Sequence, residues 1–199
     1  MRILLIGAHG TLGQAVAAEL GQRHDIITAG RNSGTLRVNL ADMASVEALY
    51  DAAGPLDAVV SAAGNVHFAP LADFRPEHYR VGLDDKLMGQ VNLVLAGQRR
   101  LNDGGSFTLT SGVLADEPIV AGSGASMVNA ALEGFARAAA IELPRGLRIN
   151  VVSPGVLVES MPVYAPFFRG FEPVPAARAA LAFSKSVEGA HSGQVYRVK

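Results

Sequence analysis

Three glycines near the start of the sequence have the spacing of a phosphate-binding turn. Gly7, Gly10 and Gly13 follow a short apolar run and open a stretch with helical periodicity. Such glycines allow a tight turn, a close approach of the backbone to a pyrophosphate, and close packing of the helix on the strand, while the helix N-terminus stabilises the phosphates. The expected contacts are Gly7, His9, Gly10, Thr11, Leu12 and Gly13. The alternatives are a structural turn without a ligand and, for His9, a solvated loop position.

A positively charged residue follows the second apolar run, at the position where dinucleotide-binding proteins discriminate between NAD and NADP. An NAD site usually has a carboxylate there that binds the ribose 2′-hydroxyl, whereas this chain has Arg31, followed by Asn32 and Ser33. A guanidinium pairs with a phosphate through charge-assisted, bidentate hydrogen bonds. We therefore expect NADP rather than NAD, the alternative being that Arg31 is an ordinary surface arginine.

The elements that must position these residues alternate between strands and helices. The expected strands are residues 3–6, 25–29, 36–38, 57–62, 106–110, 147–152 and 194–198. Helical periodicity is present in residues 45–53, 76–101, 123–143 and 175–187. Leu12, Val16 and Leu20 mark one face of a further helix near the start of the chain. Such alternation predicts an α/β fold, with a doubly wound, mostly parallel sheet covered by helices on both faces. Ligands bind such sheets at the carboxyl ends of the strands, where the two motifs above fall.

Composition limits the function classes. The 199 residues predict one domain, and a net charge of −1 without runs of like charge argues against nucleic-acid binding. There is no cysteine, no metal-ligand spacing among the 5 histidines, no apolar run that could cross a membrane and no secretory segment, so we expect a cytoplasmic protein without a metal. Charged residues are only 18% of the chain, which suggests that part of the surface is hidden in a homo-oligomer.

Four stretches together resemble the short-chain dehydrogenase/reductase family over nearly the whole chain. Besides the glycine turn, these are Val38–Asp42 (VNLAD), Ser61–Gly64 (SAAG) and Arg148–Gly155 (RINVVSPG). The resemblance implies a seven-stranded Rossmann-like sheet, a nicotinamide cofactor, and oligomers built through two long helices. It also implies further cofactor contacts, which are Asn39, Leu40, Ala62, Ala63, Gly64, Pro154 and Gly155.

The family's catalytic residues are only partly present. Its chemistry uses a serine, a tyrosine and a lysine, in which the lysine lowers the tyrosine pKa so that the tyrosine transfers a proton. Ser111 matches the serine, but Ala125 and Asn129 stand at the tyrosine and lysine positions, and residues 124–129 contain neither residue type. The usual mechanism therefore cannot operate from these positions.

A lysine stands where the family has an asparagine on the long helix. We expect this residue, Lys86, to point toward the nicotinamide pocket, where partial burial would lower its pKa and make it a proton donor or an anion anchor. The alternative is an exposed lysine beside Asp84 and Asp85.

Two further regions have open interpretations. His67 lies near the rim of the expected cleft, although a structural loop histidine is the simpler interpretation. The segment 159–173 lies where the family has a mobile substrate lid, and its aromatic residues would line either a substrate pocket or an oligomer interface. These aromatic residues are Tyr164, Phe167, Phe168 and Phe171.

Two functional hypotheses follow. The first is an NADP-dependent oxidoreductase for a small carbonyl or alcohol, in which Ser111 holds the substrate oxygen and Lys86 supplies or stabilises the proton. The second is a catalytically inactive NADP-binding sensor or partner protein, which the missing tyrosine and lysine favour. A cleft that no longer binds nucleotide is a third, less favoured interpretation because Arg31 and the glycine turn are intact.

Overall fold

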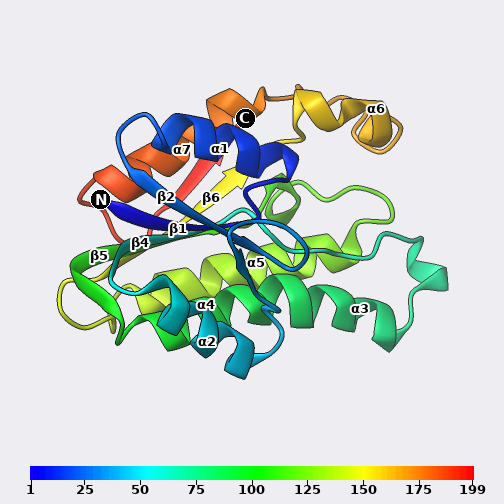
Figure 1. Cartoon of the computed structure of the whole chain (residues 1–199). Helices are drawn as coiled ribbons and strands as arrows, with labels where there is room; N and C mark the ends of the chain where they lie inside the picture. Colours follow the sequence, from blue (N-terminus) through cyan, green and yellow to red (C-terminus); the bar gives the residue numbers. More distant parts are fainter.

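The computed structural model describes residues 1–199 and contains a single parallel sheet of seven strands (Figure 1). The strands are β1 (Arg2–Ile6), β2 (Asp25–Gly30), β3 (Leu36–Arg37), β4 (Leu56–Ser61), β5 (Leu101–Thr110), β6 (Arg148–Pro154) and β7 (Val195–Val198). Their order is β3-β2-β1-β4-β5-β6-β7, and every neighbouring pair is parallel. The predicted doubly wound, Rossmann-like α/β fold is therefore confirmed.

Helices cover both faces of the sheet, so the strands β1, β4, β5 and β6 are largely buried. Helices α1 (Thr11–Leu20) and α7 (Ala176–Glu188) lie on one face, whereas α2 (Met43–Ala53), α4 (Gly89–Gly97) and α5 (Ser123–Ala139) lie on the other (Figure 1). In β1, Ile3 and Leu5 belong to the core under α1 and α7, and Leu4 and Ile6 belong to the core under α2, α4 and α5. This division explains the continuous apolar run, since successive side chains of a strand point to opposite faces.

The long helix differs from the single helix expected over residues 76–101. It consists of α3 (Pro76–Gly82), a π-helical turn (Leu83–Met88) and α4, and it ends at Gly97. A Cβ atom at Gly97 would lie 2.4 Å from the Tyr50 hydroxyl, so this glycine allows close packing of α4 on α2. Leu101 belongs to β5, where it is buried in the core.

Two other helices differ from the expected boundaries at their ends. Helix α2 begins at Met43, before the predicted start, because the Asp42 side chain accepts a hydrogen bond from the Ala44 N–H at 3.0 Å and caps the helix. Helix α5 ends at Ala139, and turns lead from there to Pro144. None of the helices combines the length and apolar character needed to cross a membrane.

The segment 159–173 lies apart from the sheet, beside the glycine-turn end of α1 (Figure 1). It contains the end of a 3₁₀ turn (Val158–Ser160) and one short helix, α6 (Met161–Tyr164). A parallel bridge between Leu157 and Val174 joins the two ends of this segment. The aromatic side chain of Phe168 is buried.

Candidate cofactor and catalytic site

The glycine turn joins β1 to α1, and its three glycines have different roles. Gly7 has φ +81°, and a Cβ atom at Gly13 would lie 2.0 Å from the Gly7 carbonyl oxygen, so backbone conformation and packing require these two glycines. At Gly10 the nearest atom would be 3.5 Å away, which is an ordinary contact. The protein's own packing therefore does not require Gly10, and the space beside it is open to a ligand. No side chain caps α1, so its first N–H groups are available to a phosphate.

A cleft of about 320 Å³ lies beside this turn, at the carboxyl ends of β1, β2 and β4. Seven of the expected cofactor residues line it, namely Gly7, Arg31, Asn32, Ser33, Leu40, Ala63 and Gly64. His9, Gly10 and Thr11 line a second hollow, of about 560 Å³, together with Glu159. Most of the expected cofactor residues therefore line one of two hollows beside the glycine turn.

The remaining expected cofactor residues do not line either hollow. Leu12 and Ala62 pack against the core under α1 and α7, and Asn39 accepts a hydrogen bond from Arg31 at 3.4 Å. Pro154 ends β6, and the Gly155 N–H donates to the Val198 carbonyl oxygen at 2.8 Å. Their contacts in this structure are thus with the protein itself.

Arg31 is bound to a carboxylate that the sequence analysis did not include in the site. Its Nη2 atom lies 2.8 Å from Oδ1 of Asp85, which belongs to the π-helical turn on the other side of the cleft. The second oxygen of Asp85 accepts hydrogen bonds from the N–H and the Nδ2 atom of Asn65, at 2.8 and 2.9 Å. Asp85 and Asn65 also line the cleft, so its lining includes an acidic group as well as a basic one.

Lys86 lies next to Asp85 but contacts a different strand. Its Nζ atom donates a hydrogen bond to the Ser111 carbonyl oxygen at 3.1 Å and makes no ion pair. A Cβ atom at Gly64 would be 2.6 Å from Cγ of Lys86, so the lysine packs directly on the loop that lines the cleft. Desolvation by burial lowers the pKa of Lys86 to about 8. The structure therefore argues against an exposed lysine paired with its acidic neighbours.

The Ser111 hydroxyl is bound to an acidic residue of α5. Ser111 is only 3% exposed, and its Oγ donates to Oε1 of Glu133 at 3.1 Å. Glu133 is also 3% exposed and forms ion pairs with Arg137 at 3.2 Å and Arg197 at 3.1 Å. A substrate oxygen would have to compete with this buried carboxylate for the serine proton. The sequence analysis missed Glu133, although Ala125, Asn129 and Glu133 recur at helical spacing on one face of α5.

Ala125 and Asn129 both lie on the buried face of α5. The Nδ2 atom of Asn129 lies 3.5 Å from the Gly112 carbonyl oxygen, and its buried Oδ1 atom has no hydrogen-bond partner. Two helices thus contact consecutive carbonyl groups after β5, because Lys86 bonds to Ser111 and Asn129 bonds to Gly112.

Apolar side chains surround Ala125 on the substrate side of the expected site. Ala125 and Phe168 belong to one small core cluster, in which Phe168 comes from the expected lid. The Tyr164 and Phe68 ring centroids are 6.2 Å apart, which links the lid to the loop after β4. At the base of the segment, the Glu159 carboxylate accepts hydrogen bonds from the Ala176 N–H at 3.0 and 3.1 Å. Phe167 remains half exposed.

His67 has a structural environment. Its ring stacks on that of His78, with the centroids 4.3 Å apart, and meets Phe74 edge-on. These contacts support the structural interpretation of His67. Within the whole chain, no group of acidic or histidine side chains is arranged to hold a metal ion.

The fold and the glycine turn define a dinucleotide-type α/β protein, and comparison with known families identifies it further. A family model described as enoyl-(acyl carrier protein) reductase matches residues 9–189. The chain belongs to the short-chain dehydrogenase/reductase family, whose members are oxidoreductases that use NAD or NADP.

Individual relatives agree with this assignment. The protein lin1944 from Listeria innocua has a TM-score of 0.99 and 52% identity, with 100% of both chains covered. A small-chain dehydrogenase in complex with NADPH has a TM-score of 0.87 at 23% identity, covers 100% of this chain and 96% of its own, and shares the fold.

A curated relative is an uncharacterized oxidoreductase from Methylorubrum extorquens. It is 31% identical over 138 residues, which are 67% of this chain and 56% of that protein. The chain therefore matches little more than half the length of this relative.

Proposed function

We propose that this protein is an NADP(H)-dependent oxidoreductase that interconverts a small carbonyl compound and its alcohol. The observation that carries the proposal is the cleft at the carboxyl ends of β1, β2 and β4, which has Arg31 in its lining and the uncapped end of α1 beside it. The fit of the dinucleotide rests on Gly10, whose missing side chain leaves space that the protein's own packing does not use.

In this proposal, the cofactor is held by three groups of residues. The free N–H groups of Thr11, Leu12 and Gly13 bind the pyrophosphate at the start of α1. The adenosine lies in the cleft against Leu40 and Ala63. Arg31, Asn32 and Ser33 hold the 2′-phosphate, for which the guanidinium must leave its present partner, Asp85.

Lys86 is the proposed acid. The bound cofactor would supply a hydride to the carbonyl carbon. The Nζ atom of Lys86 would donate a proton to the carbonyl oxygen and later regain one from solvent. A pKa of about 8 suits this role, because the group is largely protonated at neutral pH and releases its proton readily. The Ser111 carbonyl holds the ammonium in place at 3.1 Å.

The second candidate is an NADP-binding sensor or partner protein without turnover. It is favoured by the Ser111 hydroxyl, which is already bonded to Glu133, and by Ala125, which stands at the usual tyrosine position and packs with Phe168. In this candidate the site lacks the family's Tyr-x-x-x-Lys pair, and apolar side chains of the expected lid lie over the substrate side.

A cofactor titration tests both candidates. NADPH and NADH are added to the purified protein, and binding is followed by nicotinamide fluorescence and thermal unfolding. A panel of small carbonyl compounds then tests for loss of nicotinamide absorbance. Tight NADPH binding with turnover supports the oxidoreductase, and tight binding without turnover supports the sensor. The absence of binding to either cofactor would refute both.

Arg31→Asp provides the matched test of the phosphate contact. The variant should weaken NADPH binding by about tenfold or more and change NADH binding much less, because only NADPH carries the 2′-phosphate. Equal effects on the two cofactors would refute the assignment of Arg31 to the phosphate.

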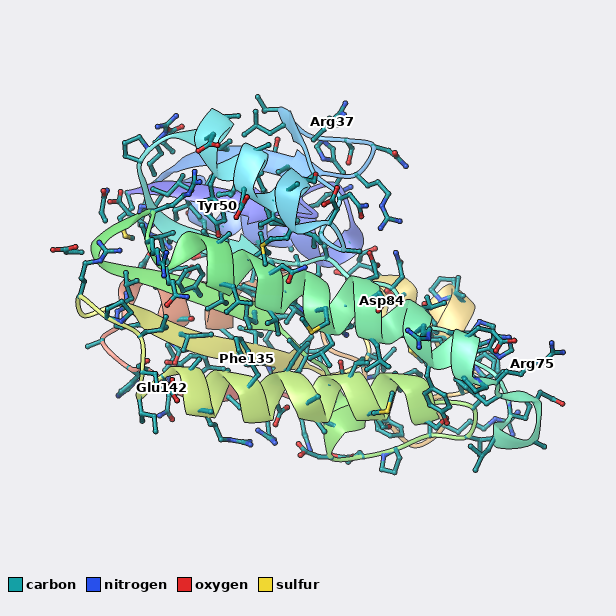
Figure 2. All side chains as sticks on the ribbon, turned by 90° about the horizontal axis from the view of Figure 1, so that it is seen from below. Arg37, Tyr50, Arg75, Asp84, Phe135 and Glu142 are labelled. Carbon is teal, nitrogen blue, oxygen red and sulfur yellow. The ribbon has the colours of Figure 1, made fainter.

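A homo-oligomer built through the long helix and α5 is also part of the proposal. Figure 2 shows that these two helices lie side by side on one face of the molecule, with the Phe135 label between them. Large apolar side chains on the long helix remain exposed there, namely Val81, Met88 and Leu95. An exposed apolar surface of this kind is typical of an interface.

A further inference from the structure

We propose that Asp85 determines the cofactor preference of this site by competing with the 2′-phosphate for Arg31 and by offering an acceptor to a 2′-hydroxyl. This inference rests on the proposed function, since it requires a dinucleotide in the cleft. It predicts that the protein accepts both NADPH and NADH, with a weak preference between them.

Asp85 and Arg31 are held to different degrees by the rest of the protein. Asp85 receives two hydrogen bonds from Asn65, and its side chain is only 18% exposed. The Arg31 side chain is 57% exposed, and its only other side-chain contact is a long one, 3.4 Å to Asn39. Arg31 is therefore free to turn toward a ligand, whereas Asp85 stays in the cleft when the ion pair opens.

The charge of Asp85 opposes a 2′-phosphate in this cleft. A 2′-phosphate bound by Arg31 would lie close to the carboxylate that Arg31 now contacts at 2.8 Å. Like charges at such a distance repel, and a partly buried site screens them less than bulk water does. Part of the attraction between Arg31 and the phosphate is therefore offset by Asp85.

Asp85 also offers a partner to the cofactor that lacks the 2′-phosphate. A ribose 2′-hydroxyl is a hydrogen-bond donor, and sites for NAD usually offer it a carboxylate at the end of the second strand. This chain has no carboxylate there, but Asp85 brings one to the same cleft from the long helix. The site thus holds a partner for each form of the ribose, Arg31 for the phosphate and Asp85 for the hydroxyl.

The test is the substitution Asp85→Asn, with Asp84→Asn as the matched control. The amide in Asp85→Asn would keep the size of the side chain and one acceptor for the Asn65 N–H while removing the charge. Asp84 is an exposed residue of the same helical turn, labelled in Figure 2, and it has no ion-pair partner. Both substitutions change the net charge equally, so a difference between them isolates the contact with Arg31.

Affinities are measured by calorimetry for NADPH and NADH, and for 2′-phospho-ADP-ribose and ADP-ribose, which cannot react. Asp85→Asn should tighten binding of the two phosphorylated ligands by about tenfold and weaken binding of the other two, whereas Asp84→Asn should change all four by less than about twofold. Asp85→Ser, which also removes the charge, should tighten binding of the phosphorylated pair in the same way. Thermal unfolding confirms that each variant is folded.

The outcomes separate this inference from the proposed function. If the wild-type protein binds NADPH but Asp85→Asn leaves the ratio of NADPH to NADH affinity unchanged, the role of Asp85 is refuted and the proposed function stands. A wild-type preference for NADPH above about 100-fold would also overturn the inference. If the wild-type protein binds none of the four ligands, the proposed function fails and the role of Asp85 fails with it.

Discussion

The Nζ atom of Lys86 lies 3.1 Å from the carbonyl oxygen of Ser111, and this hydrogen bond joins the π-helical turn to the carboxyl end of β5. The contact holds a cation beside Gly64, one of the residues that line the cofactor cleft. It also uses a backbone group of Ser111 and not its side chain, which is bonded to Glu133.

Lys86→Met should abolish reduction of the carbonyl substrate while leaving the cofactor bound. The methionine has a similar length but no proton to donate, so turnover should fall by about 100-fold or more. NADPH affinity should change by less than about threefold, because Lys86 contacts a strand end and not the expected phosphate sites. Steady-state rates and fluorescence titration give the two values.

The control for this experiment is Lys86→Arg. Arginine keeps the positive charge but does not release a proton near neutral pH. Lys86→Arg should therefore keep any purely electrostatic role of Lys86 but lose the proton transfer. An unchanged rate in both variants would remove Lys86 from the reaction.

The lowered pKa of Lys86 predicts two pH dependences of opposite direction. For the reduction, kcat/KM should fall as the pH rises through about 8, because the proton donor is lost. For stability, the unfolded state binds more protons than the folded state between this pKa and the ordinary lysine value of 10.5, so the free energy of unfolding should increase with pH across this range.

Denaturant unfolding of the wild-type protein and Lys86→Met at several pH values measures the second effect. The methionine variant should lack the increase that is due to Lys86, and its free energy of unfolding should depend less on pH between 8 and 10.5. Parallel curves for the two proteins would contradict the assignment of this pKa.

Gly10→Ala and Gly13→Ala should have different consequences. A Cβ atom at Gly10 meets only one protein atom, at 3.5 Å, so this variant should fold normally but bind NADPH at least about tenfold more weakly. A Cβ atom at Gly13 would lie 2.0 Å from the Gly7 carbonyl oxygen and should destabilise the fold by roughly 1–3 kcal/mol or more. Thermal unfolding and cofactor titration of both variants check the contrast, and normal NADPH binding by Gly10→Ala would place the pyrophosphate elsewhere.

Leu95→Glu should dissociate the proposed oligomer. Leu95 is an exposed residue of α4, and a charge there would be buried unpaired in an interface. Sedimentation should show a smaller species for this variant than for the wild-type protein. Leu181→Glu is the control, since Leu181 is exposed on α7, in the helix layer on the opposite face of the sheet. A wild-type protein that sediments as a monomer would contradict the interface.

The parallel sheet and the glycine turn were accessible from the sequence because they depend on local patterns. The run from Ile3 to Ile6 is apolar at every position, which only a strand covered on both faces requires, and all four side chains are buried. Gly7 follows this strand directly, and the close contact of Gly13 is with the Gly7 carbonyl oxygen, a neighbour in the same turn. The same reasoning placed Arg31 at the edge of the cleft.

The partners of these residues were not accessible, because they come from distant segments. Asp85 meets Arg31 through a π-helical turn, which shifts the faces of the helix relative to a regular α-helical pattern. Glu133 meets Ser111 only because α5 packs beneath the end of β5. The sequence pattern also extended the long helix to Leu101, since it contains no signal for the tight packing of Gly97 on Tyr50.

Arg197 in β7 bonds both to Asp116 and to Glu133, and Glu133 in turn accepts a hydrogen bond from the Ser111 hydroxyl. Strand β7 lies at the edge of the sheet and pairs only with β6. The orientation of a side chain near the centre of the sheet therefore depends on the docking of its outermost strand. Fraying of that edge would remove Arg197 and leave Arg137 as the remaining arginine partner of Glu133, so local unfolding at the edge of the sheet would change the charge beside the serine hydroxyl.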